Sequence, residues 1–450
     1  MRPELLIPWG VLLAVAFAAP IIIDSPRLRR TLQFGLVAAG ILVLVAQARA
    51  LPGWRLLASS LLFLYLMKAV VLLQKPREDI RKTGALGYLL FFTVWPGMAI
   101  EGLQRRTPAT EEQVRGFGRG LTCLFVGIAL LLIDAWAFPR FGDALAAWLC
   151  VAGLLLTIHF GVSEVQTALV RFFGWAVDPL FREPERSRSL EEFWGRRWNL
   201  PFVEMDRRLF VRPLVRLLGP AGATAAIFGV SGLLHEMAIS YPAGAGWGLP
   251  LAYFALQAVG TWGQSRGHLR TRWFTVAMVL VPLPLLFQPW FMERLPLELI
   301  RWLHGIIASR PAEWYLSILL WAVGVAQLLP LAASFQVPGR LRWSEDLPKL
   351  SPFNRKLMWT YGGFVVLTIV GFSVLTLALH AELLRGDRAA AWFAGFAAVY
   401  WTCRLVTDLV YWKRDDWPKG AEFVLGHALL NSLFAFLSLG YWAVVAHALW

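Results

Sequence analysis

The sequence predicts an all-α polytopic membrane protein with roughly 11–14 spans and short interfacial helices. Of its 450 residues, 58% are hydrophobic and only 16% are charged, whereas soluble domains carry roughly 25% charged residues. The mean hydropathy is +0.57. Apolar runs of about 17–25 residues, long enough to cross a bilayer, recur along the whole chain. This pattern excludes a soluble globular protein.

Each candidate span is a continuous apolar run without the alternation of a membrane β-strand. Several runs contain proline or glycine, so some of them can be broken or re-entrant helices. The run Ala85–Leu103 is the clearest case, because Pro96 and Gly97 lie inside it. The candidate spans are Leu5–Ile23, Leu32–Leu51, Trp54–Leu73, Ala85–Leu103, Phe117–Phe138, Ala144–Val162, Ala221–Tyr241, Trp247–Trp262, Trp273–Phe291, Ala312–Phe335, Leu357–Leu379, Ala389–Tyr411 and Phe423–Leu449.

The net charge of +14 comes from arginines in short loops beside the spans. Such loops are retained on the cytoplasmic side, where they face anionic lipid head groups. The charge therefore indicates membrane lipids as partners and does not imply nucleic acid. The three cysteines, Cys123, Cys150 and Cys403, lie in separate spans, so we expect neither a disulfide framework nor a metal site.

One change of composition divides the chain. The segment 338–356 contains Pro338, Pro348 and Pro352 among several charged residues, and proline disfavours continuation of a helix. We expect a linker at 338–356 between a main membrane domain at 1–337 and a C-terminal membrane module at 357–450. The role of the three spans in that module stays open.

A polar, tryptophan-rich stretch at 189–199 interrupts the apolar pattern. Its first residues form a capping-box pattern, in which Ser189 caps the helix start and Glu192 reaches back three positions. This pattern predicts a short helix through the stretch. Helical spacing would then place Trp194 and Trp198 on one face.

The end of this helix is expected close to Asn199, because Pro201 ends or bends it there. The Asn199 amide would be free to reach into a cavity. The adjacent Arg196 and Arg197 carry two permanent cations that suit phosphate oxygens. An alternative is a plain interfacial helix, with tryptophans at head-group level and arginines facing anionic lipid.

His235 lies inside the apolar run Ala221–Tyr241. An ionisable side chain in a membrane-length run is costly and indicates function. Ser231 and Gly232 precede it by four and three positions, so small residues leave a gap beside the imidazole for helix packing or for a substrate. Glu236 points about 100° away on an ideal helix and is expected to support or orient another group. A histidine that only hydrogen-bonds within the bundle is the alternative.

These two residue types suit one reaction. A neutral histidine can act as general base toward a lipid hydroxyl, because its ordinary pKa is close to neutrality. A nearby asparagine amide can donate to the oxyanion that develops on an acyl carbonyl. His235 and Asn199 together would support acyl transfer from a thioester to an alcohol.

The motifs resemble those of a known family. The stretch Ser-Leu-Glu-Glu-Phe-Trp-Gly-Arg-Arg-Trp-Asn at 189–199 is similar to the signature of wax synthases in the membrane-bound O-acyltransferase (MBOAT) superfamily. Val-Ser-Gly-Leu-Leu-His-Glu at 230–236 resembles the segment that holds the histidine of that superfamily, and 159–161 resembles a further piece. The resemblance covers about 155–245, within the main domain.

The resemblance implies an MBOAT-like multi-helix bundle with a tunnel, in which acyl-CoA enters from the cytoplasm and a lipid alcohol enters from the bilayer. It implies His235 as catalytic base and Asn199 as the second catalytic residue, with acyl-CoA as co-substrate and no further cofactor. The product would be a wax ester or a similar neutral lipid. The residues expected to bind substrate are Trp194, Arg196, Arg197, Trp198 and Ser231.

Two other functions fit parts of the pattern. A lipid or small-molecule transporter could use His235, Glu164 and Asp134 as an intramembrane polar path, although the sequence lacks the inverted repeat typical of transporters. A non-catalytic protein that binds acyl chains is the third reading. We expect a multi-pass protein of a bacterial-type inner or plasma membrane.

Overall fold

The computed structural model describes residues 3–267, 271–413 and 417–449, and within these ranges every regular element is helical. This confirms an all-α polytopic membrane protein. The chain packs as two compact units, one formed by residues 1–109 and 123–304 and the other by residues 110–122 and 305–450. The expected division into a main domain at 1–337, a linker at 338–356 and a C-terminal module at 357–450 stays a prediction.

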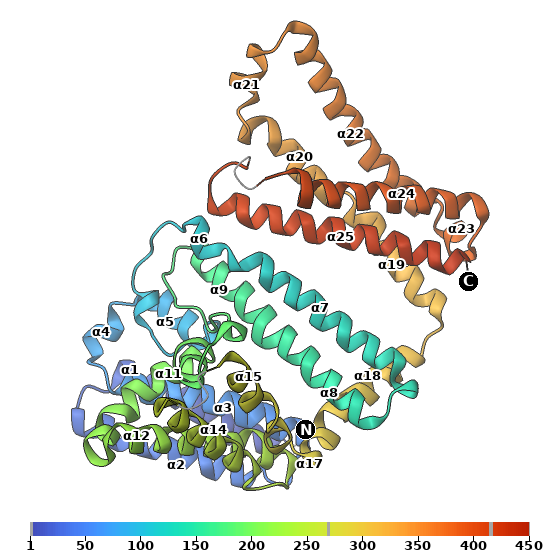
Figure 1. The fold of residues 1–450 in the computed structure, drawn as a ribbon. Coiled ribbons are helices and arrows are strands. Elements are labelled where there is room, and N and C mark those ends of the chain that lie inside the picture. The colour runs from blue at the N-terminus through green and yellow to red at the C-terminus, as the bar shows by residue number, and fades with distance from the viewer. Residues whose placement is uncertain (1–2, 268–270, 414–416, 450) are drawn as a thin grey trace. The chain divides into compact units, whose positions relative to one another are not determined.

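In the first unit, α1, α2 and α3 pack against one another, and α12 packs along α14 (Figure 1). Helices α7 and α18 belong in part to each unit. The other helices of this unit are short. The α-helices are α1 (Pro3–Ile22), α2 (Pro26–Ala46), α3 (Pro52–Leu73), α4 (Arg77–Arg81), α5 (Gly84–Thr93), α7 (Gly116–Ala137), α8 (Asp143–Leu154), α9 (Ser163–Phe172), α10 (Leu190–Glu192), α11 (Leu200–Asp206), α12 (Arg212–His235), α13 (Tyr241–Ala243), α14 (Leu249–Ser265), α15 (Arg272–Leu280), α16 (Leu283–Leu286), α17 (Pro289–Met292) and α18 (Glu298–Ala308).

In the second unit, α24 and α25 lie side by side over much of their length, and α19 packs against α22 and α25 (Figure 1). Its segment 338–356 holds the end of α20, the short helix α21 and a 3₁₀ turn, and α22 begins within it. The α-helices of this unit are α6 (Glu111–Val114), α19 (Ala312–Ala326), α20 (Leu329–Arg340), α21 (Trp343–Asp346), α22 (Pro352–Ala378), α23 (His380–Arg385), α24 (Arg388–Val406) and α25 (Ala421–Leu449).

Nine helical segments of the described chain are long and apolar enough to cross a membrane, and a bent pair gives up to ten. This is fewer than the roughly 11–14 spans expected from apolar runs alone. The nine segments are Pro26–Ala46, Pro52–Leu73, Glu111–Arg140, Asp143–Phe172, Leu200–Ala243, Ala312–Arg340, Pro352–Ala378, Arg388–Tyr411 and Ala421–Leu449.

Three of the expected spans fail for reasons of helix length or continuity. A fourth, the first run, forms α1, a helix of 20 residues, but only its part Ile7–Ile22 enters this count, and that part is too short. Helix α14 has only 17 residues. The run that ends near Phe291 is bent by 71° between two shorter helices. The run Ala85–Leu103 is helical only as far as Thr93, because the chain leaves the helix before Pro96 and Gly97.

A buried lysine accounts for the early end of α5. Lys68 of α3 is 1% exposed, and its ammonium group donates hydrogen bonds to the carbonyls of Phe91 and Trp95. The last carbonyls of a helix have no partner within the helix, so a donor from another helix stabilises the end where it is. The hydrogen bonds from Lys68 therefore stabilise both the end of α5 and the start of the loop that follows it.

A buried hydrogen-bond network joins four segments of the second unit. The Gln327 amide donates to the Tyr441 hydroxyl at 2.6 Å and to Thr376 Oγ1 at 3.4 Å, and it accepts from Trp401 Nε1 at 3.2 Å. Gln327 is fully buried, as are its three partners. Such a network fixes the packing of α19, α22, α24 and α25, because each of its polar groups would otherwise be buried without a partner.

Replacing Gln327 with leucine is expected to destabilise the protein by about 1–3 kcal/mol, because the buried Trp401 Nε1–H would lose its partner and the Tyr441 hydroxyl would keep only Thr376. Thermal unfolding in detergent micelles measures this as a lower midpoint. The control is Gln336→Leu, since Gln336 is exposed and bonds only to a carbonyl of its own helix. Equal midpoints for the two variants would contradict the role of the network.

Candidate functional site

The signature stretch begins as the sequence predicts. Ser189 Oγ accepts a hydrogen bond from the Glu192 N–H at 3.1 Å and caps α10. The return bond differs, because the Glu192 carboxylate accepts from the Arg188 N–H at 2.9 Å and not from Ser189. The Arg188 N–H and the Arg197 guanidinium lower the pKa of Glu192 below its ordinary value. Glu192 therefore carries a charge that holds the start of the motif.

The helix then widens into the π-helical turn η5 (Phe193–Arg197) and stops. Trp198 is extended, and Asn199 takes the left-handed conformation with φ 44° and ψ 59° before α11 starts. Asn199 does lie at a helix terminus, but it precedes the start of α11 and does not end the motif helix, and Pro201 lies in the first turn of α11. Its side chain caps no helix and has no hydrogen bond among the described residues. The amide is therefore available to a substrate.

The expectation that Trp194 and Trp198 share one face is wrong. Trp194 packs on Phe254 of α14 with ring centres 5.6 Å apart, and its Nε1 donates to Gln257 at 3.2 Å. Trp198 instead stacks on His159 at 6.1 Å with nearly parallel rings. The π-helical turn and the extended backbone at Trp198 break the four-residue periodicity on which the prediction depends.

The two arginines of the motif are held differently. Arg197 donates to Glu192 at 2.7 Å and to the carbonyls of Arg182 and Glu183, so it braces the loop before the motif. The Arg196 side chain is 71% exposed and lies 3.7 Å from Glu191. Neither arginine lines the cavities described below. Their contact with a substrate remains a prediction.

His235 is the last residue of α12, directly before the π-helical turn η7 (Glu236–Ser240). Its Nδ1 lies 2.7 Å from the Ser231 carbonyl oxygen. A carbonyl oxygen can only accept, so Nδ1 carries the hydrogen and Nε2 is left as the proton acceptor. The Phe254 ring packs 4.5 Å from the imidazole and holds its plane. The histidine is thus held in the tautomer that a general base needs.

Glu236 supports another element, as its direction on the helix predicts. Its carboxylate accepts from the N–H groups of Gly248 at 2.9 Å and Leu251 at 3.1 Å. These donors belong to the start of α14, where a helix favours negative charge. The contact fixes α14, and with it Phe254, relative to the end of α12.

Two cavities meet at the predicted pair. Cavity A has a volume of about 410 Å³ and is mainly apolar, with walls from α3, η3 (Leu155–Val162) and α11. Cavity B has a volume of about 250 Å³ and lies between the motif, α11 and α12. Asn199, His235 and Phe202 line both cavities. The further predicted residues that line cavity B are Trp194, Trp198 and Ser231.

A third, more polar cavity adjoins the other two. Cavity C has a volume of about 760 Å³, and its lining includes Arg105, Arg207 and Arg208. It shares Pro201 with cavity A and Arg207 with cavity B. The short helix α11 is therefore a wall common to all three. The sequence motifs did not reveal this polar cavity, in which three acidic residues, Glu101, Asp178 and Glu204, accompany the three arginines, because these side chains come from separate segments of the chain.

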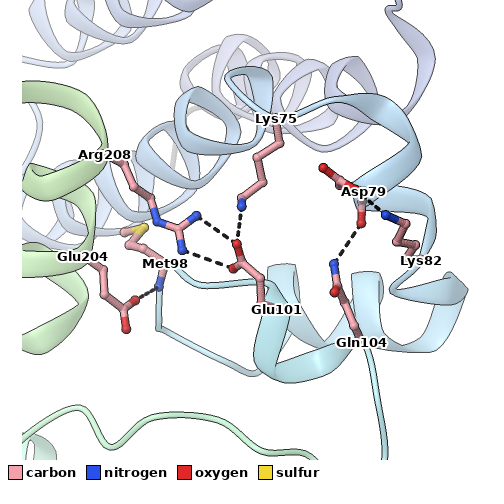
Figure 2. Close-up of polar contacts among 8 residues, drawn as sticks. All are labelled: Lys75, Asp79, Lys82, Met98, Glu101, Gln104, Glu204 and Arg208. Carbon is pink, nitrogen blue, oxygen red and sulfur yellow. Dashed lines mark hydrogen bonds and ion pairs between the residues drawn. The ribbon is translucent and has the colours of Figure 1, made fainter.

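The loop after α5 forms part of these walls and is pinned by polar contacts (Figure 2). Arg208 donates to both carboxylate oxygens of Glu101, at 3.2 and 3.3 Å, and Lys75 donates to one of them. The Met98 N–H donates to Glu204 of α11 at 3.3 Å. Glu204 of α11 and Arg208 of the π-helical turn Arg207–Val211 thus hold this loop, whose residues line cavities A and C.

At acidic pH, the contacts of Glu101 that hold the loop after α5 are expected to weaken. Burial raises the pKa of Glu101, but hydrogen bonds from Lys75 and Arg208 outweigh it and lower the pKa from 4.5 to about 2. Because the folded pKa is depressed, this stabilisation is complete above about pH 4.5 and is lost as the pH falls toward about 2. The Glu101 side chain is 46% exposed, so solvent screening keeps the effect small.

The measurement is the unfolding midpoint of wild type and of Glu101→Gln from neutral to acidic pH. The wild type should be more stable at neutral pH, and the difference should vanish as the pH approaches about 2. Glu298→Gln is the control, because that exposed carboxylate has only an exposed arginine as partner. A difference that does not change with pH would contradict the contribution of the Glu101 charge.

The acidic residues of the transporter reading do not join the site. Asp134 is fully buried on α7, and neither of its carboxylate oxygens has a partner among the described residues. Neither Asp134 nor Glu164 lines cavity A, B or C. The cavities therefore connect His235 with Asn199 and do not connect it with these two residues.

Comparisons with known proteins point to the same region. Residues 177–256 match the membrane bound O-acyl transferase family. The chain is 34% identical over 117 residues to the probable long-chain-alcohol O-fatty-acyltransferase 1 of Arabidopsis thaliana, which covers 23% of this chain and 33% of that protein. It is 38% identical over 76 residues to the long-chain-alcohol O-fatty-acyltransferase of Simmondsia chinensis, covering 15% and 22% of the two chains.

A third relative is the acyl-CoA–sterol O-acyltransferase 1 of Arabidopsis thaliana, 35% identical over 120 residues, or 25% of this chain and 35% of that protein. The matched part of the chain thus spans about a third of the length of these curated relatives or less. Asn199 and His235 both lie in the matched residues 177–256. In residues 177–256, the chain is therefore similar to the membrane bound O-acyl transferase family and to long-chain-alcohol and sterol O-acyltransferases.

Proposed function

We propose that this protein is a membrane O-acyltransferase that moves a fatty acyl group from acyl-CoA to a lipid-soluble alcohol and forms a wax ester or a similar neutral lipid. The observation that carries the proposal is the position of Asn199 and His235, which line the same two cavities. Matched relatives named as long-chain-alcohol and sterol acyltransferases support the reaction class.

In the proposed reaction, His235 Nε2 accepts the proton of the alcohol hydroxyl while the alcohol oxygen attacks the thioester carbonyl. The Asn199 amide donates to the oxyanion that develops on that carbonyl. The intermediate collapses to the ester, and the CoA sulfur leaves with the proton held by His235. The Nδ1–H bond to the Ser231 carbonyl keeps the ring oriented through both proton transfers.

The shapes and charges of the cavities suggest where each substrate lies. Cavity A is apolar and borders α3, so we assign the hydrocarbon chain of the alcohol to it. Cavity B would hold the thioester. Arg207 lines both cavity B and cavity C, and Arg105 adds a second cation, so the phosphates of acyl-CoA would lie in cavity C. Arg196, Arg197 and Trp198 stay predicted contacts on the CoA side.

This reaction requires no cofactor beyond acyl-CoA, because the histidine and the amide supply the base and the oxyanion donor. The expected bacterial-type inner or plasma membrane stays a prediction, since the three relatives described above are plant proteins.

The test is an assay of purified protein in liposomes with labelled acyl-CoA and separate alcohols, namely a long-chain alcohol, a sterol and a diacylglycerol. A labelled ester with the long-chain alcohol is the expected result. Ester formation only with the sterol would keep acyl transfer and change the acceptor. No ester with any alcohol, from protein that remains folded, would contradict the proposed function.

A further inference from the structure

A fourth cavity lies wholly within the second unit. Cavity D has a volume of about 630 Å³, which is in the usual range of about 300–1,000 Å³ for small-molecule sites. Residues of α20, α24, α25 and the π-helical turn η10 (Thr407–Tyr411) line it. Most of the lining is apolar or aromatic, including Val337, Trp412, Phe423 and Leu430.

One wall of cavity D carries a polar cluster around a buried carboxylate. Asp408 is 3% exposed and accepts from Arg404 at 2.9 Å and from His427 Nε2 at 2.6 Å. The Asn431 Nδ2 lies 2.9 Å from the same ring nitrogen, but it can only donate and so makes no hydrogen bond to Nε2 while Nε2 donates to Asp408. The ring of Trp417, which also lines the cavity, packs 4.2 Å from the His427 ring.

The carboxylate determines how His427 can bind a ligand. A carboxylate oxygen at 2.6 Å accepts the hydrogen of Nε2, so Nδ1 of the neutral ring is an acceptor. Both oxygens of Asp408 are already bonded, one to Arg404 and one to His427. The cluster can thus receive a hydrogen bond from a hydroxyl without leaving any of its own charges unpaired.

The charges that line cavity D favour a neutral ligand. Two arginines, Arg340 and Arg404, are matched by two acidic residues, Asp408 and Glu422, so the formal charges cancel. An anionic head group that paired with Arg404 would displace Asp408, at the cost of a buried unpaired carboxylate. We propose that cavity D binds a neutral single-chain lipid through its hydroxyl, which donates to His427 while the hydrocarbon chain packs on the apolar walls.

This site is separate from Asn199 and His235, and the proposal does not depend on acyl transfer. The probe is a long-chain alcohol with a photoreactive diazirine on its chain, added to full-length protein without any acyl donor. We expect crosslinks within residues 333–341, 404–412 and 417–430, and an excess of plain long-chain alcohol should prevent them. The matching fatty acid, an anion at neutral pH, should compete at least tenfold less well.

A steric variant tests occupancy of cavity D without touching its polar cluster. Gly426 lines the cavity, and a Cβ at this position would meet no atom within 4 Å, so Gly426→Leu places a side chain in open space. This variant should abolish the crosslinks. Gly371→Leu is the matched control, because Gly371 also lies in a helix with open space and lines none of the cavities.

A second variant tests the hydrogen bond. His427→Ala should weaken alcohol binding about fivefold, as expected for the loss of one hydrogen bond. His380→Ala, a histidine of the same unit outside cavity D, should leave binding unchanged. The proposal would be overturned by crosslinks that survive Gly426→Leu, by crosslinks that lie only outside the segments named above, or by equal competition from the fatty acid. Since no acyl donor is present, none of these results depends on ester formation.

Discussion

His235→Ala is expected to lower the rate of ester formation by about 10²–10⁴-fold while the protein stays folded. The reason is the loss of Nε2, the proton acceptor that the Ser231 carbonyl leaves free by holding Nδ1–H. Initial rates with saturating acyl-CoA and alcohol measure this effect, and a thermal unfolding curve of the same preparation shows whether the fold persists.

The chain offers a matched control for this variant. His304 makes the same kind of bond, from Nδ1 to the Ala135 carbonyl at 2.9 Å, and it is also partly buried. It lines none of cavities A, B and C. His304→Ala should therefore keep the rate of the wild type. A fully active His235→Ala protein, or an equal loss in both variants, would refute the assignment of the base.

Asn199→Gly is expected to lower the catalytic rate by about 10²–10³-fold, the usual effect of removing one donor to an oxyanion. Asn199 has a φ of 44°, a conformation that glycine adopts without strain. The substitution therefore removes the amide and preserves the backbone. The measurement is the rate of ester formation at saturating substrate, together with the Michaelis constant for each substrate.

A second variant, Asn199→Ala, distinguishes the catalytic effect of the amide from the effect of a Cβ on the backbone conformation. It should lose the same catalytic rate and should also be less stable than Asn199→Gly by about 1 kcal/mol, because a Cβ disfavours the left-handed region. Arg342→Gly is the control, since it makes the same kind of backbone change at a φ of 50° outside the cavities. If Asn199→Gly kept the wild-type rate, the amide would have no part in the reaction.

The all-α membrane class could be predicted because it depends on composition and on long apolar runs, which are properties of the chain alone. The number of spans could not, because helix ends depend on partners from elsewhere. The end of α5 shows this. The Phe91 carbonyl in its last turn and the Trp95 carbonyl just beyond it both bond to Lys68, which lies 23 and 27 residues earlier in the chain. A lysine in the apolar run Trp54–Leu73 was the available signal, since charges in spans are costly.

The core of the site was predictable for a related reason. Asn199 and His235 are polar groups in unusual local settings, and the cavities bring them together. Residues that act through distant contacts were missed. Glu101 and Arg208 are 107 positions apart, and Asp408 and His427 are 19 positions apart, so neither pair forms a local pattern. Ordinary local spacing also could not reveal that the helix of the motif would widen and stop before Asn199.

The position of His235 where cavities A and B meet has a consequence for substrate selection. The alcohol chain and the acyl chain of the ester would lie in different cavities, one on each side of the reacting atoms. Each cavity would therefore limit the length of one chain. Phe63 and Met67 line only cavity A, whereas Ile227 and Thr261 line only cavity B. The lengths of the alcohol and of the acyl chain could therefore be altered one at a time, and the length of the finished ester would be the sum of two independent choices.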